Sequence, residues 1–168
     1  MKRITILSCI FVFFFVSGLA NAEEMAKEGA ESYTMSYSAT VKLLAMGKER
    51  IQVNYEGLGI YMGEGLLKNC SFRFMGALQT VKGVYDNDSG LVVFTTPAGH
   101  QAFVTYEATG RIGANGKGIY KYIGGTGRLE GLQGGGEFTK ISLRPSAERT
   151  IQGYNKVEGH WKLPEIKK

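Results

Sequence analysis

The feature that most constrains the fold is a repeated alternation of apolar and polar residues with a period of two. From Tyr33 to Leu43 the apolar side chains occupy the odd positions, whereas Thr, Ser and Lys occupy the even ones. Because successive side chains of a strand point to opposite faces, this pattern predicts a half-buried β-strand. The alternation returns at 51–55, 72–78, 102–108 and 151–163. We therefore expect a chain built from strands, without a long helix after its first residues.

Turn residues separate these segments at short intervals. Gly47–Glu49, Pro97–Gly99 and Gly113–Gly116 predict turns, and Asp86–Gly90 predicts a hairpin turn because Asn, Asp and Gly tolerate positive φ. The spacing gives about eight to ten short strands, which favours an antiparallel barrel or a sandwich. Closure into a barrel removes exposed strand edges. The sequence thus predicts an all-β fold over residues 32–168, a single antiparallel closed β-barrel of roughly eight strands.

The first residues have the features of a secretory signal peptide. Lys2 and Arg3 precede an apolar run from Ile4 to Val16, and Ala20–Ala22 supplies the small residues that signal peptidase accepts. The apolar run is too short for a comfortable membrane span. We expect residues 1–22 to be cleaved and residues 23–31 to form a flexible leader. The mature protein would then be exported to the periplasm or the extracellular space, without a stable membrane anchor.

Charge, cysteine and histidine content argue against several classes of function. Loss of Lys2 and Arg3 lowers the net charge from +5 to +3, and the remaining charges are scattered rather than clustered as nucleic-acid binding requires. Cys70 is the one cysteine left after cleavage, so neither an internal disulfide nor a cysteine-based zinc site is expected. His100 and His160 lack the spacing of a metal pair. The sequence predicts no metal, no cofactor and no nucleic-acid partner.

A glycine-rich stretch, residues 121–139, raises the question of a phosphate-binding loop. It lacks the Gly-Lys-Ser/Thr of a P-loop, and Glu130 stands where a dinucleotide fingerprint needs its third glycine. The glycines that follow are poor helix formers. We therefore predict a structural glycine motif at Gly124, Gly125, Gly127 and Gly131. Gly124 and Gly125 form a tight turn with positive φ, and Gly131, together with the glycines at 134–136, allows strand bending.

The same stretch resembles a known family. "GKGIYKYIGGTGRLEGLQGGGEF" resembles the glycine motif of allene oxide cyclases, plant dirigent proteins and secreted bacterial relatives, and "VYDNDSGLVVF" and "GLLKNCSFRF" resemble earlier parts of the bacterial members. The resemblance covers roughly residues 64–139. It implies an eight-stranded antiparallel barrel, a homotrimer, an apolar lumen and a cofactor-independent cyclase or isomerase activity. The catalytic residues of the family cannot be aligned with this chain.

Aromatic residues on the apolar faces suggest a lumen that binds a small, flat, apolar ligand, with tyrosine hydroxyls as polar contacts. These residues are Tyr55, Phe72, Phe74, Tyr85, Phe94, Tyr106 and Trp161. Plain core filling explains them equally well, because an eight-stranded barrel can be packed solid. Glu56, Arg73 and Glu107 are candidates for acid–base work if a bulge, for example at Gly57, turns them inward.

Three functions follow from these patterns. The first is a non-enzymatic barrel that binds a small apolar molecule. The second is a cofactor-independent cyclase or isomerase, and the third is an interaction module whose barrel is filled. The state of the lumen distinguishes them, because an open cavity with buried ionisable groups favours catalysis, an open cavity without them favours binding, and a filled barrel favours interaction.

Overall fold

A computed structural model describes residues 26–165 and confirms the all-β prediction: eight antiparallel strands form one closed barrel. The strands are β1 (Glu28–Ala45), β2 (Arg50–Met62), β3 (Ser71–Val81), β4 (Val84–Thr95), β5 (Gln101–Arg111), β6 (Gly116–Gly125), β7 (Gln133–Leu143) and β8 (Thr150–Lys162), and a short 3-10 turn, η1 (Gly127–Leu129), precedes β7. Among these residues no helix is long and apolar enough to cross a membrane. The predicted signal peptide lies outside the described residues.

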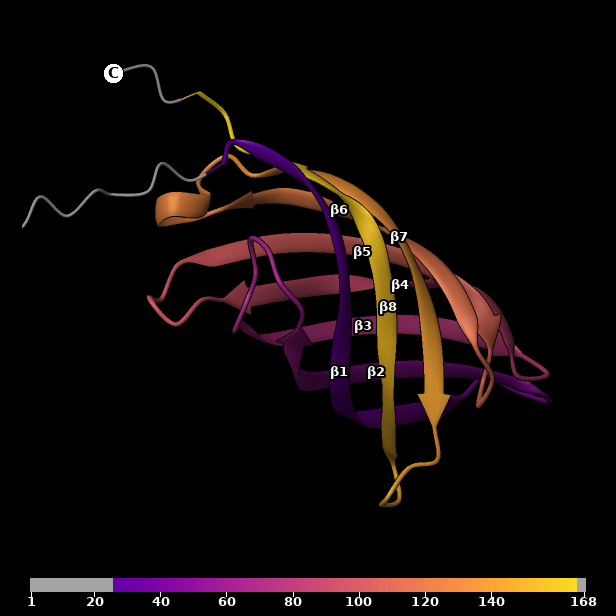
Figure 1. Ribbon diagram of the computed structural model, residues 1–168. Coiled ribbons are helices and arrows are strands. Elements are labelled where there is room, and N and C mark those ends of the chain that lie inside the picture. Colours follow the sequence, from indigo (N-terminus) through magenta and orange to yellow (C-terminus); the bar gives the residue numbers. More distant parts are fainter. Residues whose placement is uncertain (1–25, 166–168) are drawn as a thin grey trace, which may run out of the picture.

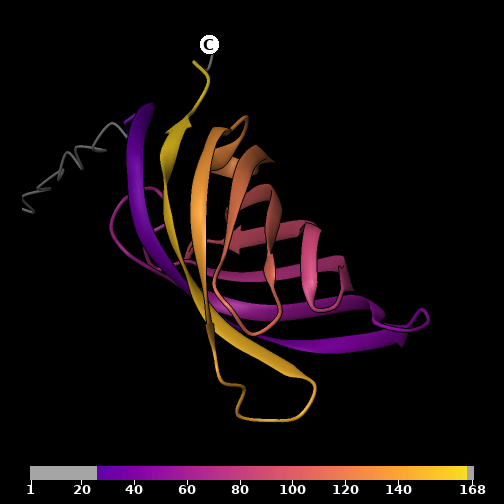
Figure 2. The same ribbon diagram turned by 90° about the vertical axis from the view of Figure 1, so that its right-hand side faces the viewer.

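Each strand pairs with its neighbours in chain order, and β1 closes the barrel by pairing with β8. That last ladder runs from Glu28 opposite Lys162 to Thr40 opposite Thr150. Strands β7, β8 and β1 cross over β2 to β5 at a steep angle (Figures 1 and 2). The two groups of strands therefore face each other across a shared interior, and their inward side chains form the core.

One end of the barrel is filled by its connections. Leu67, from the connection between β2 and β3, is fully buried, as are Leu129 and Leu132 on either side of Gly131. Both connections lie at the end of the barrel where the described chain begins and finishes (Figure 1). Cys70 is buried in the same cluster. Burial of these apolar groups excludes water from that end of the interior.

The prediction of a hairpin turn at Asp86–Gly90 is wrong, because these residues lie within β4. The chain turns instead at Lys82 and Gly83, whose φ values of 53° and 78° are those of a two-residue type I′ turn. β4 continues through residues 86–90 with a β-bulge, where the register shifts between Tyr85 and Asp88. The Asn87 Oδ1 accepts a 3.0 Å hydrogen bond from the Gln79 backbone N–H. The polar residues that suggested a turn therefore support a bulge inside a strand.

The boundary of the predicted leader is also corrected. β1 begins at Glu28, so Glu28–Glu31 is strand rather than leader, and Glu31 is buried. The segment was predicted to be a leader because it is acidic and polar, but it forms the first residues of β1. Glu31 is the first buried residue of the alternating series on β1, and Tyr33 is the next.

The backbone geometry of the predicted glycine motif differs from the prediction at one position. Gly124, Gly127 and Gly131 have positive φ values of 133°, 57° and 72°. Gly125 does not. A Cβ at Gly125 would lie 2.5 Å from the Gln101 carbonyl oxygen and would also clash with the Leu129 carbonyl oxygen. Close approach of three backbone segments, rather than positive φ, requires glycine there.

Candidate functional site

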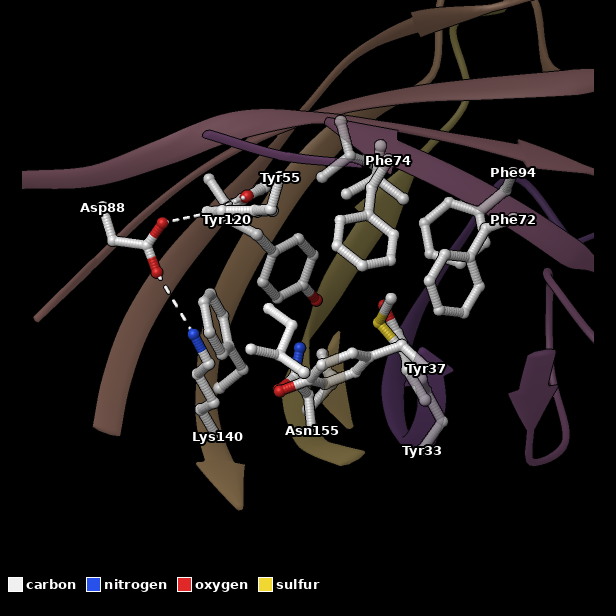
Figure 3. Close-up of a pocket in the computed structure, with 17 residues that line it drawn as sticks. Tyr33, Tyr37, Tyr55, Phe72, Phe74, Asp88, Phe94, Tyr120, Lys140 and Asn155 are labelled. Carbon is white, nitrogen blue, oxygen red and sulfur yellow. Dashed lines mark hydrogen bonds and ion pairs between the residues drawn. The ribbon is translucent and has the colours of Figure 1, made fainter. Parts of the chain in front are cut away.

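The interior of the barrel contains a cavity of about 70 Å³. An engineered cavity of about 150 Å³ is large enough for benzene, so side chains occupy most of this lumen. Figure 3 shows the polar groups of Asp88 and Lys140 on one side of the cavity and the rings of Phe72 and Phe94 on the other. The lumen is thus an aromatic space with one polar side.

The structure brings together five of the seven aromatic residues predicted to face a lumen. Tyr55, Phe72, Phe74, Phe94 and Tyr106 line the cavity. Tyr85 and Trp161 are buried inside the barrel but do not line this cavity. Trp161 instead lies over Gly29 of the neighbouring strand, where a Cβ would meet the indole at 3.0 Å. The inward orientation follows from the period of two in each strand.

The polar side of the cavity is a buried cluster centred on Asp88, which is 1% exposed. The Tyr55 hydroxyl donates to the Asp88 Oδ1, and it also lies 2.5 Å from the Tyr106 hydroxyl. The Lys140 Nζ lies 3.3 Å from the Asp88 Oδ2. Because Tyr55 has one hydroxyl proton and donates it to Asp88, Tyr106 must be the donor in the bond between the two tyrosines. The hydroxyls thus form a directed chain that ends on the carboxylate.

Two glycines make room for this chain. A Cβ at Gly76 would lie 2.5 Å from the Tyr55 hydroxyl and would clash with the Tyr106 hydroxyl. A Cβ at Gly90 would lie 2.6 Å from the Tyr106 hydroxyl. Both tyrosine hydroxyls therefore sit against bare backbone of β3 and β4. Burial raises the pKa of Tyr55 and of Tyr106, so both remain protonated donors.

Lys140 remains a cation in this cluster. Burial by itself lowers the pKa of Lys140, but nearby Asp88, Tyr37 and Tyr85 outweigh burial and raise it above its ordinary value. The ammonium group also lies 5.6 Å from the centre of the Tyr85 ring, within the range of a cation–π contact. An ammonium has three donors, and Asp88 accepts one hydrogen bond from Lys140. Lys140 can therefore donate to a bound molecule.

Asn155 provides an acceptor on the same side of the cavity. It is paired directly with Lys140 across β7 and β8, so both side chains project from adjacent points of the wall. The Asn155 Oδ1 is buried and has no hydrogen-bond partner among the described residues. A buried polar atom without a partner is costly. A group that both accepts from Lys140 and donates to Asn155 would remove that cost.

A second buried carboxylate lies elsewhere in the barrel interior. Glu31 is 7% exposed and accepts hydrogen bonds from two tyrosines of β6. The Tyr122 hydroxyl lies 3.0 Å and 2.9 Å from the two oxygens of Glu31, and the Tyr120 hydroxyl donates to Oε1. Burial raises the pKa of Glu31, although Tyr120, Tyr122 and His160 act in the opposite direction. Tyr120 lines the cavity whereas Glu31 does not.

The raised pKa of Glu31 predicts a specific pH dependence of stability. The Glu31 carboxyl keeps its proton to a higher pH in the native state than in the unfolded state. The free energy of unfolding of the wild-type protein therefore decreases as the pH rises from about 4.5 through the pKa of native Glu31. We expect Glu31→Gln, which cannot ionise, to gain free energy of unfolding relative to wild type over that interval, by about 1.4 kcal/mol per unit of pKa difference. Urea unfolding between pH 4 and pH 8 measures this.

A further variant tests whether the pKa of Glu31 causes this pH dependence of stability. Tyr122→Phe removes the hydroxyl that donates to the Glu31 carboxylate and lowers its pKa, so the loss of stability with rising pH should extend to higher pH than in wild type. A free-energy difference between Glu31→Gln and wild type that stays constant from pH 4 to pH 8 would contradict the prediction.

The three predicted acid–base candidates are not in the lumen. Glu56, Arg73 and Glu107 all lie on outward positions of their strands and are exposed. The prediction needed a bulge to turn Glu56 inward, but β2 pairs with both neighbours without a register shift through Glu56 and Gly57. A bulge does occur in β4, between Tyr85 and Asp88, and it lets both of these side chains face the interior although they are three residues apart. These three residues therefore lie on the outer surface of the barrel, and the prediction that they face the lumen is wrong.

The chemistry of the site rests on these carboxylates, tyrosines and one lysine. Within residues 26–165, no group of three or more His, Cys, Asp or Glu side chains could hold a metal ion. Comparisons of the chain with protein-family models, curated proteins and solved structures found no match. The fold and the site therefore define an eight-stranded antiparallel β-barrel with an aromatic, internally charged lumen.

Proposed function

We propose that this barrel binds a small, largely apolar molecule in its lumen, with one polar group of that molecule facing Lys140 and Asn155. The observation that carries the proposal is the buried, unpartnered Asn155 Oδ1 on the wall of an otherwise aromatic cavity, within the part of the chain that the structure describes. Ligand sites combine this kind of apolar lining with a few polar groups that fix orientation. The proposal extends the resemblance to exported barrels with apolar lumens.

The polar groups narrow the class of ligand. Lys140 donates hydrogen bonds and the Asn155 Oδ1 accepts them, so a hydroxyl group, which does both, fits better than a bare hydrocarbon. The cavity of about 70 Å³ limits the size of the apolar part. Tyr37 and Phe74 line the cavity and are half-buried, so movement of their rings would admit a single ring. A small phenol or alcohol satisfies both conditions.

Buried ionisable groups line the cavity, which by the criterion given above favours a cyclase or isomerase, but we propose binding because none of these groups is free to act as an acid, base or nucleophile. The raised pKa keeps Lys140 protonated, which removes it as a general base or nucleophile. Asp88 already accepts from Tyr55 and pairs with Lys140, so its oxygens are engaged. The pKa of Glu31 is raised, as a general acid requires, but Tyr120 and not Glu31 faces the cavity.

Phenol and toluene, which have the same size, test the proposal. We expect phenol to bind wild type and Asn155→Leu to weaken phenol binding by about fivefold, the value of a hydrogen bond of about 1 kcal/mol. Toluene binding should not weaken, because toluene makes no such bond. Chemical-shift titration by NMR measures both affinities. Asn54→Leu, at an exposed position of β2, is the matched control. Equal effects of Asn155→Leu on both ligands, or no binding of phenol at millimolar concentration, would contradict the proposal.

A further inference from the structure

The connections between strands at one end of the barrel expose apolar side chains. The connections β1–β2, β3–β4, β5–β6 and β7–β8 lie opposite to the end where the described chain begins and finishes (Figure 1). We call residues 42–51, 81–84, 111–116 and 143–150 the turn end. It is about a fifth of the described chain. It nevertheless holds eight of the fifteen large apolar residues that are exposed there: Leu43, Leu44, Met46, Ile51, Val81, Val84, Ile112 and Leu143.

The β1–β2 hairpin exposes aliphatic residues on both of its faces. Leu43 and Leu44 are neighbours on β1, so they point to opposite faces of the strand, and they are 61% and 64% exposed. Val41 is still half-buried, so burial along β1 ends before Leu43, which the alternation of residues 33–43 predicted to be buried. Met46, in the connection itself, is 45% exposed. These side chains therefore add nothing to the core of the barrel.

Hydrogen bonds join the four connections into one rim. Three backbone bonds of 2.8 to 2.9 Å link successive connections: Val41 N–H to the Arg149 carbonyl, Lys82 N–H to the Glu49 carbonyl, and Ile112 N–H to the Gly83 carbonyl. The Ser142 hydroxyl donates to the Ala114 carbonyl at 2.9 Å, which links the end of β7 to the β5–β6 connection. The turn end is therefore a continuous surface that a partner can contact as a whole.

The turn end is also strongly basic. It holds seven of the twenty Lys and Arg residues of the chain but two of its fifteen Asp and Glu residues, so the rest of the chain has equal numbers of both. All seven are exposed: Lys42, Lys48, Arg50, Lys82, Arg111, Arg144 and Arg149. Within residues 26–165, Lys82 pairs with Glu49 at 3.5 Å, and the other six have no ion-pair partner. Charges that are scattered along the sequence are thus gathered at one end of the barrel.

The connections at the opposite end differ in both respects. Leu67, Leu129 and Leu132 are fully buried there. Residues 63–70, 96–100 and 126–132 also carry two basic and two acidic residues, so their charges balance. Connections of this barrel therefore do not need exposed aliphatic residues or a net positive charge. The composition of the turn end has to be explained by what it contacts.

We infer that the turn end binds the surface of an anionic phospholipid bilayer. The aliphatic side chains enter the interface between headgroups and acyl chains, and the Lys and Arg side chains contact the headgroup phosphates. Interfacial binding uses this combination of buried apolar area and attraction to anionic lipids. A neutral apolar partner would leave the cations without counter-charge, and a nucleic acid would leave the aliphatic side chains without an apolar contact. The inference is independent of ligand binding in the lumen.

Co-sedimentation with lipid vesicles tests the inference. We expect the protein to bind vesicles of equal parts phosphatidylcholine and phosphatidylglycerol at least tenfold more tightly than vesicles of phosphatidylcholine alone, and less tightly as salt is raised. The double variant Lys48→Gln with Arg50→Gln should weaken binding by about tenfold or more, because each basic residue near an anionic surface contributes about fivefold. Leu43→Ser with Leu44→Ser should weaken it by a similar factor through loss of buried apolar area.

Two double variants elsewhere on the outer surface are matched controls. Lys121→Gln with Lys156→Gln removes two exposed charges from β6 and β8, and Leu58→Ser with Ile60→Ser removes two exposed aliphatic residues from β2. Both should leave binding unchanged, and circular dichroism verifies that each variant is folded. Absence of binding to anionic vesicles, equal binding to both kinds of vesicle, or equal losses in hairpin and control variants would overturn the inference. A loss in the charge variant alone would show attraction to polyanions without contact with the bilayer interior, and would overturn it as well.

Discussion

Replacing Asp88 by Ala is expected to destabilise the barrel by about 3–5 kcal/mol, the cost of breaking a buried ion pair by removing one partner. The side chain of Asp88 is 2% exposed and that of Lys140 is 17% exposed, so the ammonium would remain largely buried without its counter-ion. The Tyr55 hydroxyl would also lose its acceptor. A loss of this size is a large share of the roughly 5–15 kcal/mol typical of a domain. Urea unfolding at neutral pH measures the change.

A double variant separates the charge from the cavity left by the side chain. Asp88→Ala with Lys140→Met removes both charges and keeps most of the volume of the lysine stem, so we expect it to be more stable than Asp88→Ala alone. Removal of both partners of a buried pair is often nearly neutral. If the free energy of unfolding of Asp88→Ala lay within about 1 kcal/mol of the wild-type value, the Lys140 ammonium would have to be hydrated at little cost once Asp88 is removed. That result would contradict the buried pair.

The second large effect is expected at Gly125. Replacement by Val should destabilise the protein by about 3 kcal/mol or more, because the new side chain would meet backbone atoms of Gln101 and Leu129 that cannot move aside without disturbing β5 and η1. Lys121→Val, at an exposed position of β6, is the matched control and should change stability by less than about 0.5 kcal/mol. Thermal melting of both variants measures the difference.

The same experiment tests the structural role of the glycine motif. If the glycines shape the backbone, ATP and NAD should leave the melting temperature of wild type unchanged. A melting temperature that rises with nucleotide in wild type, and not in Gly125→Val, would show that the loop binds phosphate after all.

The two faces of the barrel sheet differ in composition. Inward positions carry aromatic rings and a few buried ionisable groups, whereas outward positions of β2 to β4 carry exposed aliphatic residues. Because alternate residues of a strand point to opposite faces, each strand contributes to both surfaces without conflict. Variants of Asn155 should therefore affect ligand binding without changing the outer surface.

Local patterns in the sequence are sufficient to predict the architecture and much of the lining of the lumen. The period of two specifies which side chains of each strand share a face, so the alternation alone assigns Tyr55, Phe72 and Tyr106 to the apolar faces that line the cavity. The glycine-rich stretch identifies the connection between β6 and β7. These features depend on neighbours a few residues apart, and a short window of sequence carries that information.

The polar centre of the lumen, in contrast, depends on contacts that no local pattern reveals. A bulge in β4 lets Tyr85 and Asp88, three residues apart, both face inward, and nothing in the alternation of residues 84–95 distinguishes a bulge from a turn. Barrel closure then brings Asp88 to Lys140, which is 52 residues away, and Glu31 to Tyr122, which is 91 residues away. The free energy of these contacts depends on burial and on distances between strands that meet when the sheet closes, and both arise from the whole fold rather than from any segment of the chain.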